Sequence, residues 1–355
     1  GGRNLEVELS RLLAILSARD LYEPKFEEWH GWLQRMSKSS NCRVSSNAER
    51  ALLHSKSSWL KIHDGVHLLV PGSGHHLKPS EIDADIVFVH GLNGGPFSSW
   101  CMGQEDNSNM ELQQCWPTVW LAGKHPRLRL LSLEYRAKIF NWEGAQHSFP
   151  EQSAAMMKKL AAAGVGKRPV IFVAHSMGGL MVKEMMMQGS YSANEGIDEG
   201  IDSRIQDIIT NTKGVAFYST PHFGSWIASA SYNLLSWRLK DTINVVLRPG
   251  PYLSELNDFF NKFSQAQQVN VISFAEAAPT PLIDLGLTAL SAEVVPAESA
   301  FPGYGDLCMV EKDHIRVCKP NSKHDVAYKK LEEFIEKSLQ EAGIKLDAVD
   351  TPENQ

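Results

Sequence analysis

The sequence predicts an α/β fold in which helices cover both faces of a mostly parallel sheet. Three observations predict it. Short apolar strands alternate with helical segments from about residue 85 onward, several of these strands end in glycine-rich or polar loops, and one serine lies on an abrupt turn between a strand and a helix. Alternation of this kind is typical of parallel sheets built from strand–helix–strand units. The 355 residues suffice for one large domain and an accessory segment.

Composition narrows the class of protein. The hydrophobic fraction of 43% and the charged fraction of 21% are ordinary for a globular chain. A net charge of −6 argues against broad nucleic-acid binding, so we expect no nucleic-acid partner. No apolar run is long enough to span a membrane, which takes about 18 residues or more. The five cysteines lack C-x-x-C spacing, and we expect neither a metal nor an organic cofactor.

The N-terminal residues 1–75 are predicted to form a short all-helical segment followed by a linker. The leucines between residues 5 and 16 fall on one face of a helix. Further helices are expected over 26–36 and 47–62, and the turn-rich stretch 71–76 serves as the linker. We interpret this segment as a cap on the domain that follows, with helices that could contact a protein partner.

The main domain is expected over residues 76–345, with a polar tail at 346–355. Its predicted strands are residues 86–89, 128–135, 170–174, 214–219, 269–274 and, as the last strand, 292–295. Helices are expected over 151–163 and 325–339. In parallel sheets of this kind, active sites lie at the carboxyl ends of the strands. The candidate functional residues below all follow such ends.

The stretch around Ser176 is the most informative. An apolar strand, Val170–Ala174, runs into a sharp turn, and a helix is predicted from about Gly179. A serine on such a turn needs small residues two positions before and after it, and here they are Ala174 and Gly178. The helix also directs its first N–H groups toward developing negative charge. This pattern is the nucleophile elbow of α/β-hydrolases, although A-H-S-M-G departs from G-x-S-x-G. We therefore predict that Ser176 is a nucleophile.

A nucleophilic serine of this type also needs donors for an oxyanion. The tripeptide His90-Gly91-Leu92 follows an early strand, where these folds supply one backbone N–H. We assign the two donors to the N–H groups of Leu92 and Met177. Five residues near these loops are expected to bind substrate: His90, Gly91, His175, His222 and Trp226.

The general base is assigned to His314. Triads in this fold follow the order serine, acid, histidine along the chain. His314 lies in a late loop after the last predicted strand. His222 precedes the expected acid, and His324 adjoins the C-terminal helix, where a surface position is expected.

The acid is assigned to Glu276, which lies just past the end of the strand over 269–274. Glu298 is the main competitor, followed by Asp284 and Asp306. With these assignments Ser176 would attack an acyl carbonyl while His314 takes its proton and Glu276 orients the imidazole.

An insertion over residues 224–265 is rich in large apolar groups. As a lid or as a wall for an acyl chain it would suit a lipid-like substrate. As ordinary packing it would need no function.

Six motifs carry a resemblance to a known family. They are, in order, HGLNG, AHSMGGL, YSTPHFGS, FAEA, VPAESA and DHIRVCKP. Over roughly residues 80–340 the chain resembles the serine active site-containing protein 1 family, which is related to the lipase-like deacylases of glycosylphosphatidylinositol. The resemblance implies an α/β-hydrolase fold in which Ser176 and His314 match the family's serine and histidine. Residues 1–65 would match the end of a preceding helical region.

The resemblance also implies a role. It suggests remodelling of phospholipid, chiefly phosphatidylglycerol, with peripheral contact to a membrane. It also places this activity at mitochondria and their contacts with the endoplasmic reticulum. The first residues of the chain themselves show no targeting pattern.

The leading hypothesis is thus a serine acyl hydrolase or transacylase acting on a phospholipid. One alternative is an esterase or thioesterase acting on a protein or a small-molecule acyl group. The other is a non-catalytic scaffold on a hydrolase fold.

Overall fold

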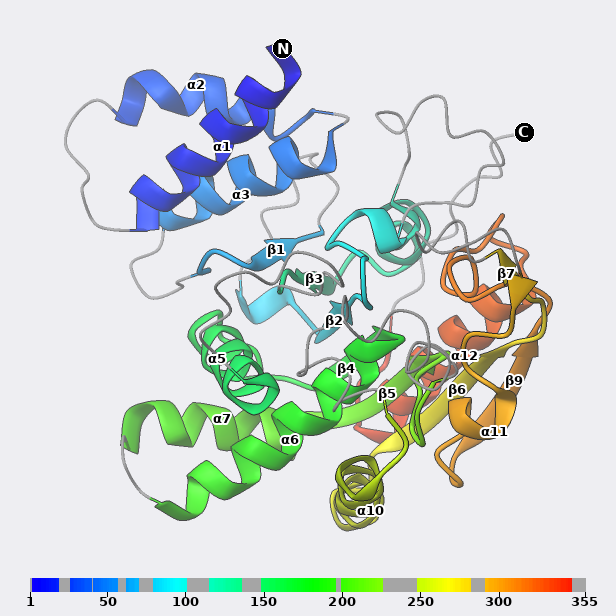
Figure 1. The fold of residues 1–355 in the computed structure, drawn as a ribbon. Coiled ribbons are helices and arrows are strands. Elements are labelled where there is room, and N and C mark those ends of the chain that lie inside the picture. The colour runs from blue at the N-terminus through cyan, green and yellow to red at the C-terminus, as the bar shows by residue number, and fades with distance from the viewer. Residues whose placement is uncertain are drawn as a thin grey trace.

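The computed structural model describes residues 2–18, 26–39, 41–56, 62–69, 79–100, 115–135, 148–195, 199–225, 248–281 and 291–346 (Figure 1). Within these ranges a seven-stranded sheet forms the centre of the molecule, in the order β1-β3-β2-β4-β5-β6-β9. The strands, in that order, are Val66–Leu68, Leu128–Leu133, Ala84–Val89, Val170–His175, Thr212–Tyr218, Asn270–Glu276 and Asp306–Val310.

Only β1 runs antiparallel to its neighbour in this sheet, and the other neighbouring strands are parallel. An antiparallel edge strand, a parallel series and a serine turn after the central strand β4 together make an α/β-hydrolase fold. The predicted fold class is therefore confirmed.

The central strands are apolar on both sides because helices cover both faces of the sheet. Every residue of β2, β3 and β4 is buried. Alternate side chains of β4 enter different cores: Phe172 and Ala174 pack on one face, and Ile171 and Val173 on the other.

Four helices pack on the first face: α5 (Phe149–Ala162), α6 (Met177–Glu195), α7 (Glu199–Asn211) and α10 (Pro251–Ala266). The second face is covered by α12 (Val326–Glu341) and by the segment containing η4 (Pro117–Leu121) and α4 (Ala122–Lys124). Shorter elements are η1 (Pro79–Glu81), η2 (Ser98–Trp100) and α11 (Ala297–Ala300). Helix α5 begins at a capping box, in which the Ser148 side chain and Glu151 exchange hydrogen bonds with each other's backbone N–H.

The last strand differs from the sequence prediction. Residues 292–295 do not form the sheet edge, because only Ser291–Ala292 (β8) is a strand and it pairs antiparallel with β7 (Thr280–Pro281). The edge strand of the main sheet is β9, whose Leu307 and Met309 are 45% and 48% exposed. Residues 307–310, Leu-Cys-Met-Val, form an apolar run like those of the other strands, so the sequence carried the signal and the prediction overlooked it. The three-residue β1 was missed for a different reason, since it is too short to show a period.

The N-terminal helices α1 (Gly2–Ala18), α2 (Phe26–Met36) and α3 (Cys42–Lys56) confirm the predicted helical segment. Helix α3 begins five residues before the predicted start at Asn47, because Asn41 caps it: its Oδ1 accepts hydrogen bonds from the N–H groups of Arg43 and Val44. The predicted C-terminal end of this helix, Ile62, follows residues 57–61, which lie outside the described residues. In Figure 1 these helices lie beside β1, at the end of the sheet remote from β9.

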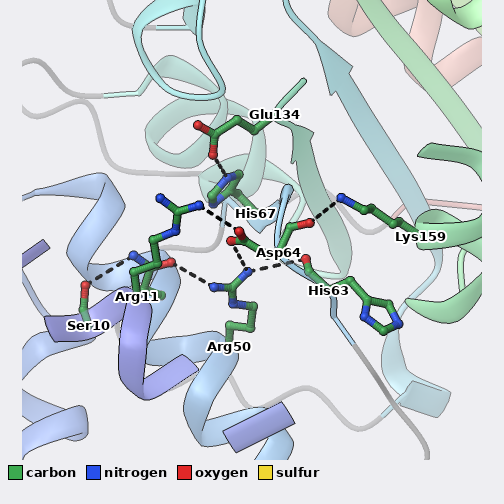
Figure 2. A network of polar contacts seen from close by, with 9 residues as sticks. Ser10, Arg11, Arg50, His63, Asp64, His67, Glu134 and Lys159 are labelled. Carbon is green, nitrogen blue, oxygen red and sulfur yellow. Dashed lines mark hydrogen bonds and ion pairs between the residues drawn. The ribbon is translucent and has the colours of Figure 1, made fainter. Parts of the chain in front are cut away.

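One aspartate joins the N-terminal helices to the sheet (Figure 2). The carboxylate of Asp64, just before β1, accepts a hydrogen bond from Arg11 of α1 at 2.8 Å and pairs with Arg50 of α3 at 3.5 Å. Its backbone carbonyl accepts a hydrogen bond from Lys159 Nζ of α5 at 2.7 Å. Arg50 is only 2% exposed, so Asp64 offsets a buried positive charge. Burial alone would raise the pKa of Asp64, but the two arginines lower it overall.

We expect Asp64→Asn to lower the free energy of unfolding at pH 7 by on the order of 1–2 kcal/mol, since the carboxylate is 42% exposed and partly screened. A carboxylate whose pKa is lowered by folding contributes stability that is present above its unfolded pKa and lost as the pH falls. The gap between the native protein and the variant should therefore close below about pH 4. Denaturant unfolding at a series of pH values measures it.

The matched control is Glu333→Gln, which removes an exposed ion pair with Lys330 and should leave stability unchanged. An Asp64→Asn variant as stable as the native protein at pH 7 would contradict the anchoring role.

Among the described residues, no helix combines the length and the hydropathy needed to cross a lipid bilayer.

Candidate active site

Ser176 lies at the tip of the turn between β4 and α6, in a strained backbone conformation. Its φ of 53° is in the left-handed region, which non-glycine residues rarely adopt. The surrounding sheet holds it there: the Ser176 N–H donates to the carbonyl of Tyr218 at 2.8 Å, and its own carbonyl accepts from Gly179 N–H at 3.0 Å. The turn thus presents the serine side chain at the carboxyl edge of the sheet.

Two glycines allow neighbouring backbones to approach this turn. A Cβ on Gly178 would collide with the carbonyl oxygens of Val89 and His90. A Cβ on Gly91 would lie 2.7 Å from the Cβ of Ser176 and 2.9 Å from the carbonyl oxygen of His175. The loop after β2 therefore lies directly against the serine, as the oxyanion assignment requires.

Ser176, His314 and Glu276 form a continuous chain of hydrogen bonds. His314 Nε2 lies 2.9 Å from Ser176 Oγ, and His314 Nδ1 lies 2.6 Å from Glu276 Oε2. Both Ser176 and His314 are 6% exposed, and Glu276 is fully buried. The three residues come from the ends of β4 and β6 and from the loop after β9, segments far apart in the sequence. This geometry can transfer a proton from the serine to the imidazole.

Backbone groups hold the carboxylate of Glu276. Its Oε1, which does not contact His314, accepts hydrogen bonds from the N–H groups of Val294 at 2.7 Å and Val295 at 3.1 Å. The N–H of Glu276 itself donates to Ser219 Oγ at 3.2 Å. Two hydrogen bonds of this kind fix the direction of the carboxylate, so that Oε2 faces His314.

The competing candidates are placed elsewhere. Glu298 is exposed on α11, and Asp306 is exposed at the start of β9. His324 is exposed just before α12. Asp284 and Trp226 lie outside the described residues.

His175 contacts the backbone of His314, the assigned base. Its Nε2 lies 2.7 Å from the backbone carbonyl of His314, and Thr280 Oγ1 accepts a hydrogen bond from His314 N–H at 2.9 Å. Burial, together with the charge that His314 can carry, lowers the pKa of His175 well below its ordinary value. A neutral His175 therefore donates from Nε2 and holds the His314 backbone in place.

His222 lies in a second buried polar cluster with Lys183. The imidazole packs edge-on against Phe217 at 4.8 Å, and neither ring nitrogen has a hydrogen-bond partner among the described residues. Lys183 Nζ donates to Asn257 Oδ1 at 2.5 Å and lies 5.5 Å from the Phe217 ring centroid. Burial lowers the pKa of both His222 and Lys183 well below their ordinary values. Neither side chain is part of the hydrogen-bonded chain at Ser176.

The two assigned oxyanion donors lie on the two segments that meet at Ser176. Met177 is the first residue of α6, and Leu92 follows the closely approaching Gly91. Backbone N–H groups at such a position can stabilise a developing oxyanion, and the N-terminus of α6 adds a favourable field.

Several contributors to this site escaped the sequence analysis: Thr280, the N–H groups of Val294 and Val295, and Tyr135, which contacts the loop after β2. Backbone donors leave no mark in a sequence, and a tyrosine at the end of a strand reads as a core residue. Ser219, which accepts a hydrogen bond from the N–H of Glu276, did carry a sequence signal, because it lies at a strand end, as Ser176 does. In the structure it too has a positive φ, of 42°.

A cleft of about 650 Å³ lies at the opposite edge of the sheet, where β6 and β9 begin. Its lining includes Asn270 and Asp306 and none of the residues of the Ser176 chain. The chemistry therefore has to be sought at the carboxyl edge. Throughout the described ranges, no group of three His, Cys, Asp or Glu side chains is placed to hold a metal ion.

The strand order defines an α/β-hydrolase fold, and the buried chain from Ser176 through His314 to Glu276 has the geometry of an activated serine nucleophile. The chain is 37% identical to Protein SERAC1 of Danio rerio over 329 residues and 34% identical to Protein SERAC1 of Homo sapiens over 330 residues. These alignments include 88% and 87% of this chain but 47% of each relative, so the chain spans about half their length. The resemblance to the serine active site-containing protein 1 family is thereby confirmed for the shared segment.

No protein-family model matches the chain. Among solved structures, the Bacillus licheniformis lipase BlEst2 in its propeptide form aligns with 78% of this chain and 53% of its own, at 18% identity and a TM-score of 0.46. Phospholipase PlaB from Legionella pneumophila in complex with thio-NAD aligns with 73% of this chain and 62% of its own, at 13% identity and a TM-score of 0.43. These likenesses are distant, and the fold assignment rests on the strand order.

Proposed function

We propose that this protein is a serine acyl hydrolase, or transacylase, that acts on phospholipid. The observation that carries the proposal is the buried chain of hydrogen bonds from Ser176 through His314 to Glu276, at 2.9 Å and 2.6 Å. A serine so placed is activated by its neighbour, and a scaffold protein would not need a strained serine turn, an aligned base and a buried acid together.

The reaction follows from the geometry. Ser176 Oγ attacks the acyl carbonyl carbon and transfers its proton to His314 Nε2, while the backbone donors bind the oxyanion. His314 then protonates the departing alcohol as the ester bond breaks, which leaves an acyl group on Ser176. Water attacks this acyl group in hydrolysis, or another hydroxyl does so in acyl transfer, and His314 takes the proton of the attacking hydroxyl. The bond between the acyl carbon and Ser176 Oγ then breaks, and His314 returns the proton to Oγ. Glu276 keeps Nδ1 protonated and stabilises the imidazolium throughout.

The phospholipid substrate is proposed from the family resemblance, as is a preference for phosphatidylglycerol. The same source supports peripheral contact with a membrane, a location at mitochondria or their contacts with the endoplasmic reticulum, and a protein partner for the N-terminal helices.

One observation favours the narrower alternative of an esterase or thioesterase. The described part of the apolar insertion includes α10, and its Leu253, Leu256 and Phe260 are buried against the sheet. These side chains serve ordinary packing and are not available to line a path for an acyl chain. The substrate class therefore has to be decided by experiment.

We expect a fluorophosphonate probe to label the native protein, and both Ser176→Ala and His314→Ala to abolish or nearly abolish labelling. The probe reacts with a serine only when a base has activated it. Labelled protein is counted by gel fluorescence, and the folded state of each variant is checked by circular dichroism. His324→Ala is the matched control, because this exposed histidine should leave labelling unchanged. Folded native protein that resists the probe would favour the scaffold alternative.

The substrate class is tested next with phosphatidylglycerol, other phospholipids and soluble esters of increasing chain length. Turnover that rises with chain length and with presentation in vesicles supports the phospholipid proposal. Turnover of short esters or thioesters alone would replace it with the esterase alternative.

A further inference from the structure

We infer that Tyr135 is a positioning residue that, through His90, orients the backbone N–H of Leu92 toward the reacting carbonyl. The inference rests on the proposed function, since it assigns Leu92 as an oxyanion donor. It adds two residues whose contribution is made through the backbone of a loop.

Tyr135 is placed beside this loop by the sheet. Strands β2 and β3 run parallel, and Val89 at the end of β2 pairs with Leu133 at the end of β3. Two residues further along, the hydroxyl of Tyr135 donates a hydrogen bond to the carbonyl of His90 at 2.6 Å. The Tyr135 ring stacks on the His90 imidazole, with centroids 4.6 Å apart and planes inclined by 13°. Burial raises the pKa of Tyr135, so the hydroxyl keeps its proton and remains a donor.

The His90 imidazole, held by this stack and by the hydroxyl bond to the His90 carbonyl, acts on the next peptide unit. His90 Nδ1 lies 2.9 Å from the carbonyl oxygen of Gly91. A carbonyl oxygen only accepts hydrogen bonds, so Nδ1 carries the proton in this contact. The Nε2 atom has no hydrogen-bond partner in the described part of the chain, and burial lowers the pKa of His90 to about 4. His90 is therefore neutral, with its proton on Nδ1.

The carbonyl of Gly91 and the N–H of Leu92 belong to one planar trans peptide, so they point in opposite directions. Fixing the carbonyl fixes the N–H. The Gly91 oxygen accepts from His90 Nδ1 at 2.9 Å and also from Gly94 N–H at 3.1 Å, so both of its lone pairs are engaged. Because Gly91 approaches Ser176 closely, a rotation of this peptide would move the N–H away from the position of the oxyanion.

Tyr135 is itself anchored from the other side. The preceding residue, Glu134, lies 2.7 Å from His67 Nε2 of β1, and its N–H donates to the carbonyl of Gly65 at 2.8 Å. Figure 2 shows this pair beside the Asp64 network that binds the N-terminal helices. The loop is thus held by a residue at the hydrogen-bonded junction between the first strands and the helical segment.

The decisive variant is Tyr135→Phe, which keeps the ring and removes the hydroxyl. We expect kcat for a soluble ester, and the rate of fluorophosphonate labelling, to fall at least about tenfold with KM nearly unchanged. Complete loss of an oxyanion donor costs roughly 10²–10³-fold, and a misaligned donor should lose part of that. The matched control is Tyr328→Phe, which removes another buried tyrosine hydroxyl, bonded to Glu332 at 3.2 Å on α12. It should leave kcat unchanged.

A second pair of variants covers the event that Tyr135→Phe does not fold. His90→Asn retains a side-chain N–H near the place of Nδ1 and should keep most of the activity, whereas His90→Ala should lower kcat with KM nearly unchanged. Equal activity in these two variants would overturn the inference.

Tyr135→Phe at the native rate, with the same change in Tm as Tyr328→Phe, would show that Tyr135 only packs. A native protein without activity would overturn the proposed function, and this inference with it. Failure of the inference alone leaves the native protein active, so the two failures are distinguishable.

Discussion

Replacing Glu276 by glutamine is expected to lower kcat about 10⁴-fold in a protein that still folds, by analogy with the aspartate-to-asparagine exchange in the triad of a serine protease. The glutamine amide carries one oxygen and one NH₂ group, whereas both carboxylate oxygens of Glu276 accept hydrogen bonds here. One faces the N–H groups of Val294 and Val295, and the other faces His314. If the amide oxygen satisfies the two backbone donors, its NH₂ group faces His314 Nδ1. The imidazole must then carry its proton on Nε2, where it cannot accept one from Ser176.

The measurement is kcat and KM for a soluble ester, together with labelling by a fluorophosphonate. Glu298→Gln is the control, since this exposed carboxylate on α11 was the main competing acid in the sequence. It should leave kcat within a factor of about two. A Glu298→Gln variant that is inactive beside an active Glu276→Gln would reverse the assignment of the acid.

Replacing Gly178 by alanine is expected to inactivate the protein and to lower the free energy of unfolding by about 1–3 kcal/mol or more. The added methyl group would meet the carbonyl oxygens of Val89 and His90, which are backbone atoms of a buried strand end and cannot turn aside as a flexible side chain can. Relief requires α6 or the loop after β2 to shift, and either movement separates Ser176 from the oxyanion donors. Activity should therefore fall even in the fraction that remains folded.

Gly31→Ala serves as the matched control. Gly31 lies within α2, and apart from the adjacent backbone of that helix no heavy atom comes within 4 Å of a Cβ built on it. Alanine is the better helix former, by roughly 1 kcal/mol, so this variant should be as stable as the native protein or more so. Thermal unfolding and the labelling rate of the two variants, measured side by side, separate a local clash from a general effect of losing glycine. A Gly178→Ala variant with native kcat would contradict the close approach of the two segments.

The sequence indicated the parts of this fold that carry strong local patterns. Continuous apolar strands and a serine between small residues predict β2, β4 and the turn at Ser176, because full burial leaves a dense apolar run. The order of the triad along the chain pointed to Glu276 and His314. In the structure His314 is hydrogen-bonded both to Ser176 and to Glu276.

What the sequence could not indicate depends on contacts between distant segments. Residues 292–295, with two valines, were predicted as the last strand in place of β9, although β9 has an apolar run of its own. In the structure the N–H groups of Val294 and Val295 bind the carboxylate of Glu276, a role that any residue except proline can fill. The orientation that we infer for the Leu92 N–H depends in the same way on Tyr135, which is 43 positions away in the sequence.

The short strand β1 has a consequence for any attempt to work with the catalytic part alone. It lies within the first 75 residues, between the helices and the linker, yet it pairs with β3 along the edge of the main sheet. A fragment that starts at residue 76 would lose this strand and leave β3, with its apolar side chains, as a bare edge open to pairing with other molecules. The same cut would take away Asp64, the partner of Lys159 on α5. The shortest independently soluble fragment should therefore begin before β1.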